Sequence, residues 1–301
     1  MRALVRRSAC VKHMSSNLKI PSPWSQFALL LLLFGGALIL AVGTINLIPG
    51  VHQGVVPADP DKQKLAQALT TVICFGLPAL TFVVMTFKDH PFRDFGLRPA
   101  PKSIYYLLGV LLLFFSFPAE GWLGILNQRI ALASWMTKME ADRQKEILAM
   151  LQVHHPYDLI VNLLLVAVVA GVFEELFFRG ALQRIMIHIC RNPWAGILVT
   201  AFLFSAMHFQ FEGFLPRMFL GILLGAAYWY SGSLWTPIIA HIFFNGIQVL
   251  AATWYPGTVA ENPSVPAYSA LISLVIVVGL LAYMRRESTV TYAQIYQPTS
   301  E

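Results

Sequence analysis

The stretch that decides the fold is LIVNLLLVAVVAGVFEELFFRGAL, residues 159–182. About fifteen of its residues are large aliphatic side chains or Phe, and each favours membrane insertion by roughly 0.3–0.6 kcal/mol. Glu174, Glu175 and Arg179 lie in its second half, and each charge near a helix centre opposes insertion by roughly 2.5–3.5 kcal/mol. The favourable insertion energy of the apolar residues and the unfavourable energy of the charges nearly cancel, so the helix tolerates its charges only at a cost. The three charges therefore indicate a functional site inside the membrane.

The composition extends this interpretation to the whole chain. The sequence is 57% hydrophobic and only 12% charged, with a mean hydropathy of +0.64, which is too apolar for an ordinary soluble domain. Its apolar runs are continuous rather than alternating, which argues against a barrel. We therefore expect an all-α, polytopic transmembrane helical bundle with about eight spans and a catalytic core of four helices. The expected spans are residues 27–48, 66–87, 103–117, 159–182, 193–209, 215–230, 233–253 and 270–284.

The distribution of Lys and Arg predicts how the chain lies in the membrane. With the N-terminus inside, most of these residues fall in cytoplasmic segments, while Arg217 falls on the opposite side. This asymmetry largely explains the net charge of +6, so nucleic acid is not an expected partner. We expect a basic cytoplasmic tail (1–24), one transmembrane domain (25–286, with a motif-bearing core about 88–250) and a cytoplasmic tail (287–301). The expected location is a bacterial cytoplasmic (inner) membrane.

The loop 119–157 is long for a compact membrane protein. It contains SWMTKMEADRQKEILAML (134–151), whose helix formers and charges predict an extramembrane or interfacial helix. A plain connecting helix is the favoured interpretation, and a gate or substrate-recruiting element is the alternative.

Two further apolar segments carry polar residues. TAFLFSAMHFQF (200–211) places His208 towards the end of its span, and SLWTPIIAHIFFNGIQ (233–248) places His241 and Asn245 four residues apart on one helical face. Glu175 and Arg179 are also four apart and are expected to pair. Each feature has a structural alternative, namely a packing histidine, an asparagine bridging two helices, or an ion pair that locks them. His208 lies late in its span, which fits poorly with a site nearer the cytoplasmic half.

Together, FEELFFRGAL (173–182), FSAMH (204–208) and HIFFN (241–245) resemble, in order, the three motifs of the CPBP family. These are intramembrane proteases related to the CAAX prenyl endopeptidase Rce and to Abi-type bacterial proteins. The resemblance covers roughly residues 88–246. It implies an intramembrane endopeptidase that acts on a peptide or membrane-protein substrate in the lipid bilayer.

The resemblance also implies roles for individual residues. Glu174 is expected to act as general base on the attacking water, and Asn245 to donate to the developing oxyanion. His208 and His241, with Glu174, are the expected ligands if Zn²⁺ is bound; a metal-free glutamate mechanism remains the alternative. Glu175 is expected to complete or orient the site, with Arg179 as its anchor.

The expected site needs water at membrane depth, which predicts a cavity open to the cytoplasmic side and walled by the fourth to seventh spans. Gly221 and Gly225 have the spacing for close helix packing beside it. Two rival functions stay open: a non-catalytic scaffold or bacteriocin self-immunity protein, and a proton-coupled transporter. Substrate preference, use of prenylated substrates and oligomeric state are not readable from the sequence.

Overall fold

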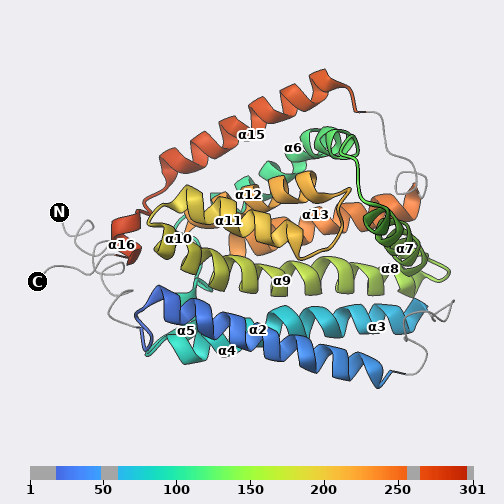
Figure 1. Cartoon of the computed structure of the whole chain (residues 1–301). Coiled ribbons are helices and arrows are strands. Elements are labelled where there is room, and N and C mark those ends of the chain that lie inside the picture. Colours follow the sequence, from blue (N-terminus) through green and yellow to red (C-terminus); the bar gives the residue numbers. More distant parts are fainter. Residues whose placement is uncertain (1–17, 49–59, 256–264, 297–301) are drawn as a thin grey trace, which may run out of the picture.

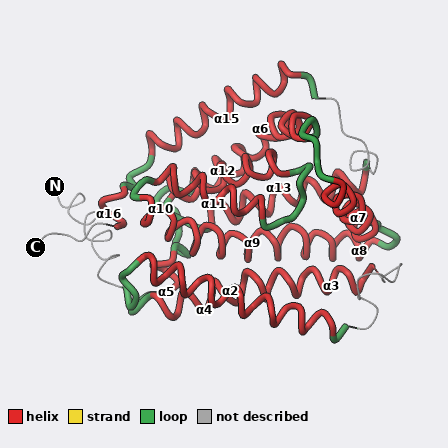
Figure 2. The backbone as a smooth tube through the Cα atoms, viewed as in Figure 1, coloured by secondary structure: helices red, strands yellow, loops and turns green. Residues whose placement is uncertain are grey.

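The fold is a bundle of helices (Figure 1 and Figure 2). The computed structural model describes residues 18–48, 60–255 and 265–296, and over these ranges the regular elements are all helices. The β-type pairing within them is a single isolated bridge between Leu18 and Phe87. The all-α prediction is confirmed. Most of the predicted tail 1–24 lies outside the described residues, which begin at Leu18.

The described part of the chain has six helical runs that are long and apolar enough to cross a membrane. All eight expected segments do form helices, but α11 (Pro193–Ala206) has only 14 residues, and α12 (Phe214–Ser231) has 18 and includes Arg217. The count of eight spans is therefore not confirmed. The six runs are α2 (Pro23–Asn46), α3 to α4 (Pro60–Thr86), α6 (Ile104–Asn127), α8 to α10 (Pro156–Cys190), α13 (Trp235–Trp254) and α15 (Ala267–Glu287).

Two of these runs contain π-helical turns, in which the backbone is wound more widely than in an α-helix. In the helix that carries the first motif, such turns lie on both sides of Glu174 and Glu175. A count of 100° per residue from the sequence does not anticipate them. The pieces are α3 (Pro60–Thr71), η1 (Val72–Gly76) and α4 (Leu77–Thr86), and α8 (Pro156–Asn162), η2 (Leu163–Val169), α9 (Ala170–Glu175), η3 (Leu176–Gln183) and α10 (Arg184–Cys190).

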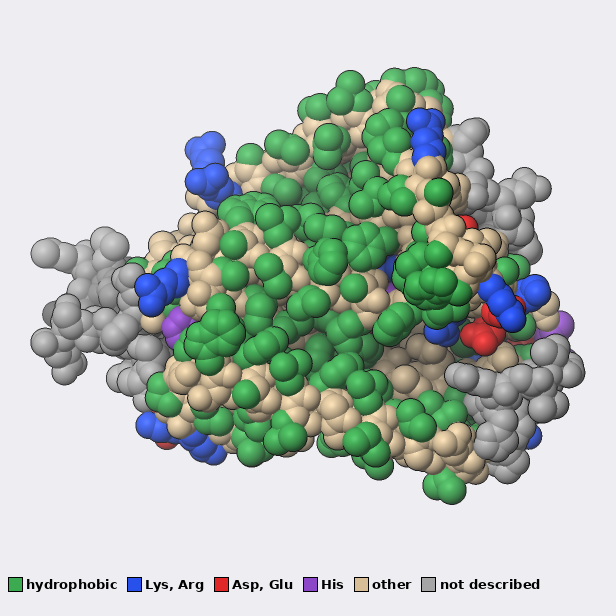
Figure 3. Space-filling model, viewed as in Figure 1, with side chains coloured by type: hydrophobic (Ala, Val, Ile, Leu, Met, Phe, Trp, Pro, Cys, Tyr) green, Lys and Arg blue, Asp and Glu red, His purple; other side chains and the backbone are tan. Residues whose placement is uncertain are grey.

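The motif helix α8–α10 lies at the middle of the bundle, between α2 to α4 on one side and α11 to α13 on the other, with α6 and α15 farther out (Figure 1). One apolar cluster joins all three of these layers through residues such as Phe82 of α4, Phe178 of η3 and Phe204 of α11. A second joins α6, α12, α13 and α15. Hydrophobic side chains cover most of the visible flank, whereas charged ones gather towards the two ends (Figure 3), as expected for a membrane protein.

Two short helices mark one end of the bundle and one longer helix marks the other. The start of α2, with α5 (Pro91–Phe95) and α16 (Tyr292–Tyr296), lies at the end opposite α7 (Ser134–Leu151) (Figure 1). The predicted helix 134–151 is confirmed as α7, which has no buried residue. The third expected span was too short, because α6 continues through Pro118 to Asn127.

The shortness of α11 explains the depth of His208. Asn192 caps the N-terminus of this helix, because its Oδ1 accepts hydrogen bonds from Trp194 N (2.9 Å) and Ala195 N (3.2 Å). Fourteen residues extend only about 21 Å, against about 30 Å of hydrocarbon. The predicted span 193–209 therefore ends early, at Ala206, and His208 stops at the level of Glu174 near the middle of the motif helix.

Close backbone approaches hold α11 in place. A Cβ atom on Gly221 of α12 would lie 3.0 Å from Ala201 Cβ, which agrees with the packing role expected for this glycine. At Gly196 of α11, a Cβ atom would lie 2.5 Å from the backbone nitrogen of Ile187 in α10. The backbone cannot give way as a flexible side chain can, so α10 and α11 require glycine at this contact.

We expect Gly196→Ala to destabilise the protein by about 1–3 kcal/mol, because the added methyl group overlaps the neighbouring helix. Thermal unfolding in detergent measures the change. Gly279→Ala in α15 is the matched control, since a Cβ atom there meets nothing within 4 Å and Ala favours a helix. Equal loss in the two variants would contradict the packing described here.

Candidate active site

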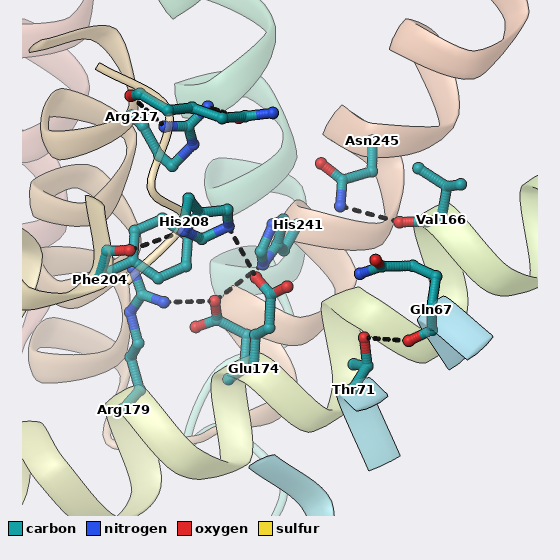
Figure 4. Close-up of polar contacts among 12 residues, drawn as sticks. Gln67, Thr71, Val166, Glu174, Arg179, Phe204, His208, Arg217, His241 and Asn245 are labelled. Atoms are coloured by element: carbon teal, nitrogen blue, oxygen red, sulfur yellow. Dashed lines mark hydrogen bonds and ion pairs between the residues drawn. The ribbon is translucent and has the colours of Figure 1, made fainter. Parts of the chain in front are cut away.

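The core of the site is a buried ion-pair network centred on Glu175. Its Oε1 atom accepts a hydrogen bond from Arg179 Nη1 (2.6 Å) and another from His241 Nδ1 (2.9 Å). Arg179 Nη2 also donates to the carbonyl oxygen of Gly221 (3.1 Å). Glu175 and Arg179 have no exposed surface. The predicted Glu175–Arg179 pair is confirmed, and it joins the motif helix to both α12 and α13; Figure 4 shows Arg179 and His241 on their two helices.

Two further contacts extend this network: a hydrogen bond from Gln183 and a cation–π contact between Arg179 and Phe204. One turn after Arg179, Gln183 Nε2 donates to the carbonyl oxygen of Gly225 (3.0 Å), so two successive side chains bind the α12 backbone. Sequence analysis missed Gln183, although its spacing of four from Arg179 is the signal that marks one helical face. The Arg179 guanidinium also lies 4.6 Å from the ring centroid of Phe204, which places a cation over the aromatic residue of the second motif.

Glu174 has a different environment from the adjacent Glu175. Its side chain is 11% exposed, and its Oε2 atom lies 4.0 Å from Nε2 of His208, whose side chain is 27% exposed. That separation is too long for a direct hydrogen bond. Glu174 thus faces a histidine without being bound to it, whereas the Oε1 atom of Glu175 is hydrogen-bonded to both Arg179 and His241. The arrangement leaves the Glu174 carboxylate able to accept a proton from a third group placed beside it.

Both histidines present their Nε2 atoms to the site because their Nδ1 atoms are held elsewhere. His208 Nδ1 is 2.7 Å from the carbonyl oxygen of Phe204, and His241 Nδ1 binds Glu175. Metal-binding histidines commonly have such outer partners, so the donors suit zinc in kind. Over the described residues, however, no group of three or more His, Cys, Asp or Glu side chains is spaced to hold a metal ion.

Asn245 lies one turn beyond His241, but its side chain turns away from the other site residues. Its Nδ2 atom donates to the carbonyl oxygen of Val166 in η2 (3.1 Å), as Figure 4 shows. The structure thus gathers five of the six predicted site residues and leaves the amide of Asn245 bridging α13 to the motif helix. This contact is the structural alternative that the sequence left open.

His208 belongs to a tightly held connection, residues 207–213, between α11 and α12. Phe209 has a φ of 51°, a left-handed conformation that is unfavourable for a residue with a side chain. Asn127 at the end of α6 restrains the connection and the start of α12, because its Nδ2 donates to Phe211 O and its Oδ1 accepts from Leu215 N, both at 2.7 Å. Glu140 of α7 accepts from the backbone nitrogens of Phe211 and Glu212.

Arg217 is the main residue beside the site that the sequence analysis did not count among the site residues. It lies beside His208 (Figure 4) and interacts electrostatically with Glu174 and Glu140; its predicted position on the non-cytoplasmic side stays a prediction. The signal was present, because FLPRMFLG is an apolar segment interrupted by one charge. Because α11 ends at Ala206, α12 begins early and Arg217 in its first turn lies beside His208. The predicted cavity and the face to which it opens stay predictions.

An all-helical integral membrane protein with a buried Glu–Arg–His network is the class that the fold and site define. Residues 156–247 match the family model of the type II CAAX prenyl endopeptidase Rce1-like proteins. That segment contains all three motifs, and the predicted resemblance to the CPBP family of CAAX proteases is confirmed for it.

One curated relative is an uncharacterized 24.3 kDa protein of Escherichia coli, 31% identical over 124 residues. The match covers 39% of this chain and 52% of the relative, so the chain spans about half of that protein's length. No solved structure matches the chain.

Removing Arg179 tests how strongly the network stabilises the fold. We expect Arg179→Ala to lower the free energy of unfolding by about 3–5 kcal/mol, since Glu175 would stay buried without its cation. Arg143→Ala is the control. It removes an exposed pair with Glu146 (3.4 Å), and its expected cost is within about 1 kcal/mol. Equilibrium unfolding in mixed micelles measures both values, and a small loss for Arg179→Ala would argue against a structural network.

Proposed function

We propose that this protein is an intramembrane endopeptidase that hydrolyses peptide bonds in a peptide or membrane-protein substrate. The observation that carries the proposal is the pair formed by Glu174 and His208, which are close, partly exposed and not bonded to each other. It stands on a rigid buried frame within the Rce1-like segment. The proposed setting is the lipid bilayer of a bacterial cytoplasmic membrane.

Glu174 acts as the general base in the proposed reaction. Its carboxylate takes a proton from a water molecule, and the water oxygen attacks the scissile carbonyl carbon while the carbonyl electrons move to oxygen. When this tetrahedral intermediate collapses, the C–N bond breaks and the leaving nitrogen receives the proton from Glu174. Glu175 orients His241, and Phe204 orients His208. Asn245 can serve as oxyanion donor only after its amide leaves Val166 O.

Zinc is proposed as a cofactor with a metal-free mechanism as its alternative. Glu174, His208 and His241 are the residues that would hold the ion, and their donor atoms suit it. Bound zinc would polarise the carbonyl and make water more acidic. The side chains would have to move closer together, because the described residues do not gather at the spacing of a metal site.

Glu174→Gln tests proteolysis directly. We expect new N-termini released in native membranes expressing the wild type to disappear in this variant, because an amide cannot accept the proton. Mass spectrometry of N-termini provides the readout. Glu146→Gln on exposed α7 is the matched control, whereas Arg217→Gln is unsuitable because Arg217 lies at the site. Identical profiles from wild type and a well-folded Glu174→Gln protein would favour a non-catalytic scaffold or immunity role.

Metal content distinguishes the two mechanisms. If zinc is the cofactor, purified protein should hold about one ion per chain, and His208→Ala or His241→Ala should lose it. Elemental analysis after size-exclusion chromatography gives this value without any activity assay. Full Glu174-dependent cleavage by protein without stoichiometric metal would exclude zinc in favour of the glutamate mechanism.

A further inference from the structure

Arg217 occupies the side of the site opposite Glu174. It lies in the first turn of α12, is half-buried, and its side chain projects towards the region above His208 (Figure 4). The guanidinium donates to the backbone oxygen of Gln210 (3.4 Å) and to the Gln210 side chain. Glu174 and Arg217 thus lie on either side of His208 (Figure 4).

The charge of Arg217 is not needed to hold the connection 207–213 in place. Asn127 binds Phe211 O in this connection and Leu215 N in the first turn of α12, and Glu140 binds two backbone nitrogens of the connection. Ser205 Oγ of α11 also donates to Phe214 O at the start of α12 (2.7 Å). A charged side chain in an apolar helix is costly and commonly marks function. A neutral side chain could donate the same hydrogen bonds to Gln210 at a smaller desolvation cost than a guanidinium.

Among the site residues that the structure describes, the two other candidate donors to an oxyanion are already hydrogen-bonded elsewhere. Asn245 gives its amide to Val166 O, and Arg179 is fully buried beneath Glu175. Arg217 has five N–H groups, of which Gln210 engages two. The remaining donors are charged, and the guanidinium interacts electrostatically with both Glu174 and His208. Hydrogen bonds from a cation strengthen as negative charge develops on oxygen.

We propose that Arg217 is a further catalytic residue, whose guanidinium donates to the scissile carbonyl oxygen as it becomes an oxyanion. This assignment rests on the proposed endopeptidase function. The connection held by Asn127 and Glu140 sets the position of Arg217 relative to Glu174 and His208. The cation therefore assists the electrophile while Glu174 activates the nucleophile, from opposite sides of the substrate.

The test uses a synthetic peptide that spans a Glu174-dependent cleavage site of the wild type, with full-length protein in liposomes. We expect Arg217→Gln to lower kcat by about 100-fold or more, with KM changing much less. Arg217→Lys, which keeps the charge, should restore part of the loss. Gln210→Ala removes the tie but not the cation, and it should cost far less than Arg217→Gln.

Each outcome decides one question. Equal losses in Gln210→Ala and Arg217→Gln would show that Arg217 only ties the connection, and a change confined to KM would assign it to substrate binding. Either result overturns the proposal. If Arg217→Gln does not fold, Arg217→Lys and Gln210→Ala still give the comparison. Cleavage that needs Glu174 but tolerates Arg217→Gln refutes only this assignment, whereas absence of Glu174-dependent cleavage refutes the endopeptidase proposal as well.

Discussion

The hydrogen-bonded ion pair between Glu175 and Arg179 is the interaction on which the remaining structure depends. Both side chains are removed from water, and two charges at this depth persist only if each finds close partners. Glu175 finds Arg179 and His241, and Arg179 adds the backbone of Gly221. Because these partners come from different helices, satisfying the charges fixes how the motif helix is rotated against α12 and α13.

That rotation explains how two neighbouring glutamates come to differ. Once Glu175 points into the protein, the next residue back along the helix points elsewhere, and Glu174 reaches the partly exposed His208. The second motif contributes at two levels, because Phe204 covers the Arg179 guanidinium and its carbonyl oxygen holds His208 Nδ1. One motif residue therefore stabilises the frame and orients the reactive pair. A change at Phe204 would therefore affect both the buried ion pair and the position of His208.

The sequence allowed the helical class, the Glu175–Arg179 pair and the convergence of the three motifs to be predicted, since these follow from hydropathy and from spacings of four residues. It did not reveal the end of α11, because Met207 and His208 are as compatible with a helix as the residues before them. The position of Arg217 depends on that end, and so it was missed as well. The direction of Asn245 was equally hidden, since a backbone carbonyl such as Val166 O leaves no trace in the sequence.

The early end of α11 also has a consequence for the surrounding lipid. A helix of 14 residues falls roughly 9 Å short of a hydrocarbon core of ordinary thickness. The bilayer must thin beside α11, or neighbouring helices must shield the polar connection that follows it. In either case, the polar backbone that follows α11 lies deeper than the end of a full-length span would place it. The length of the acyl chains thus becomes a physical variable of the site, and membranes of different thickness would present the same residues at different depths.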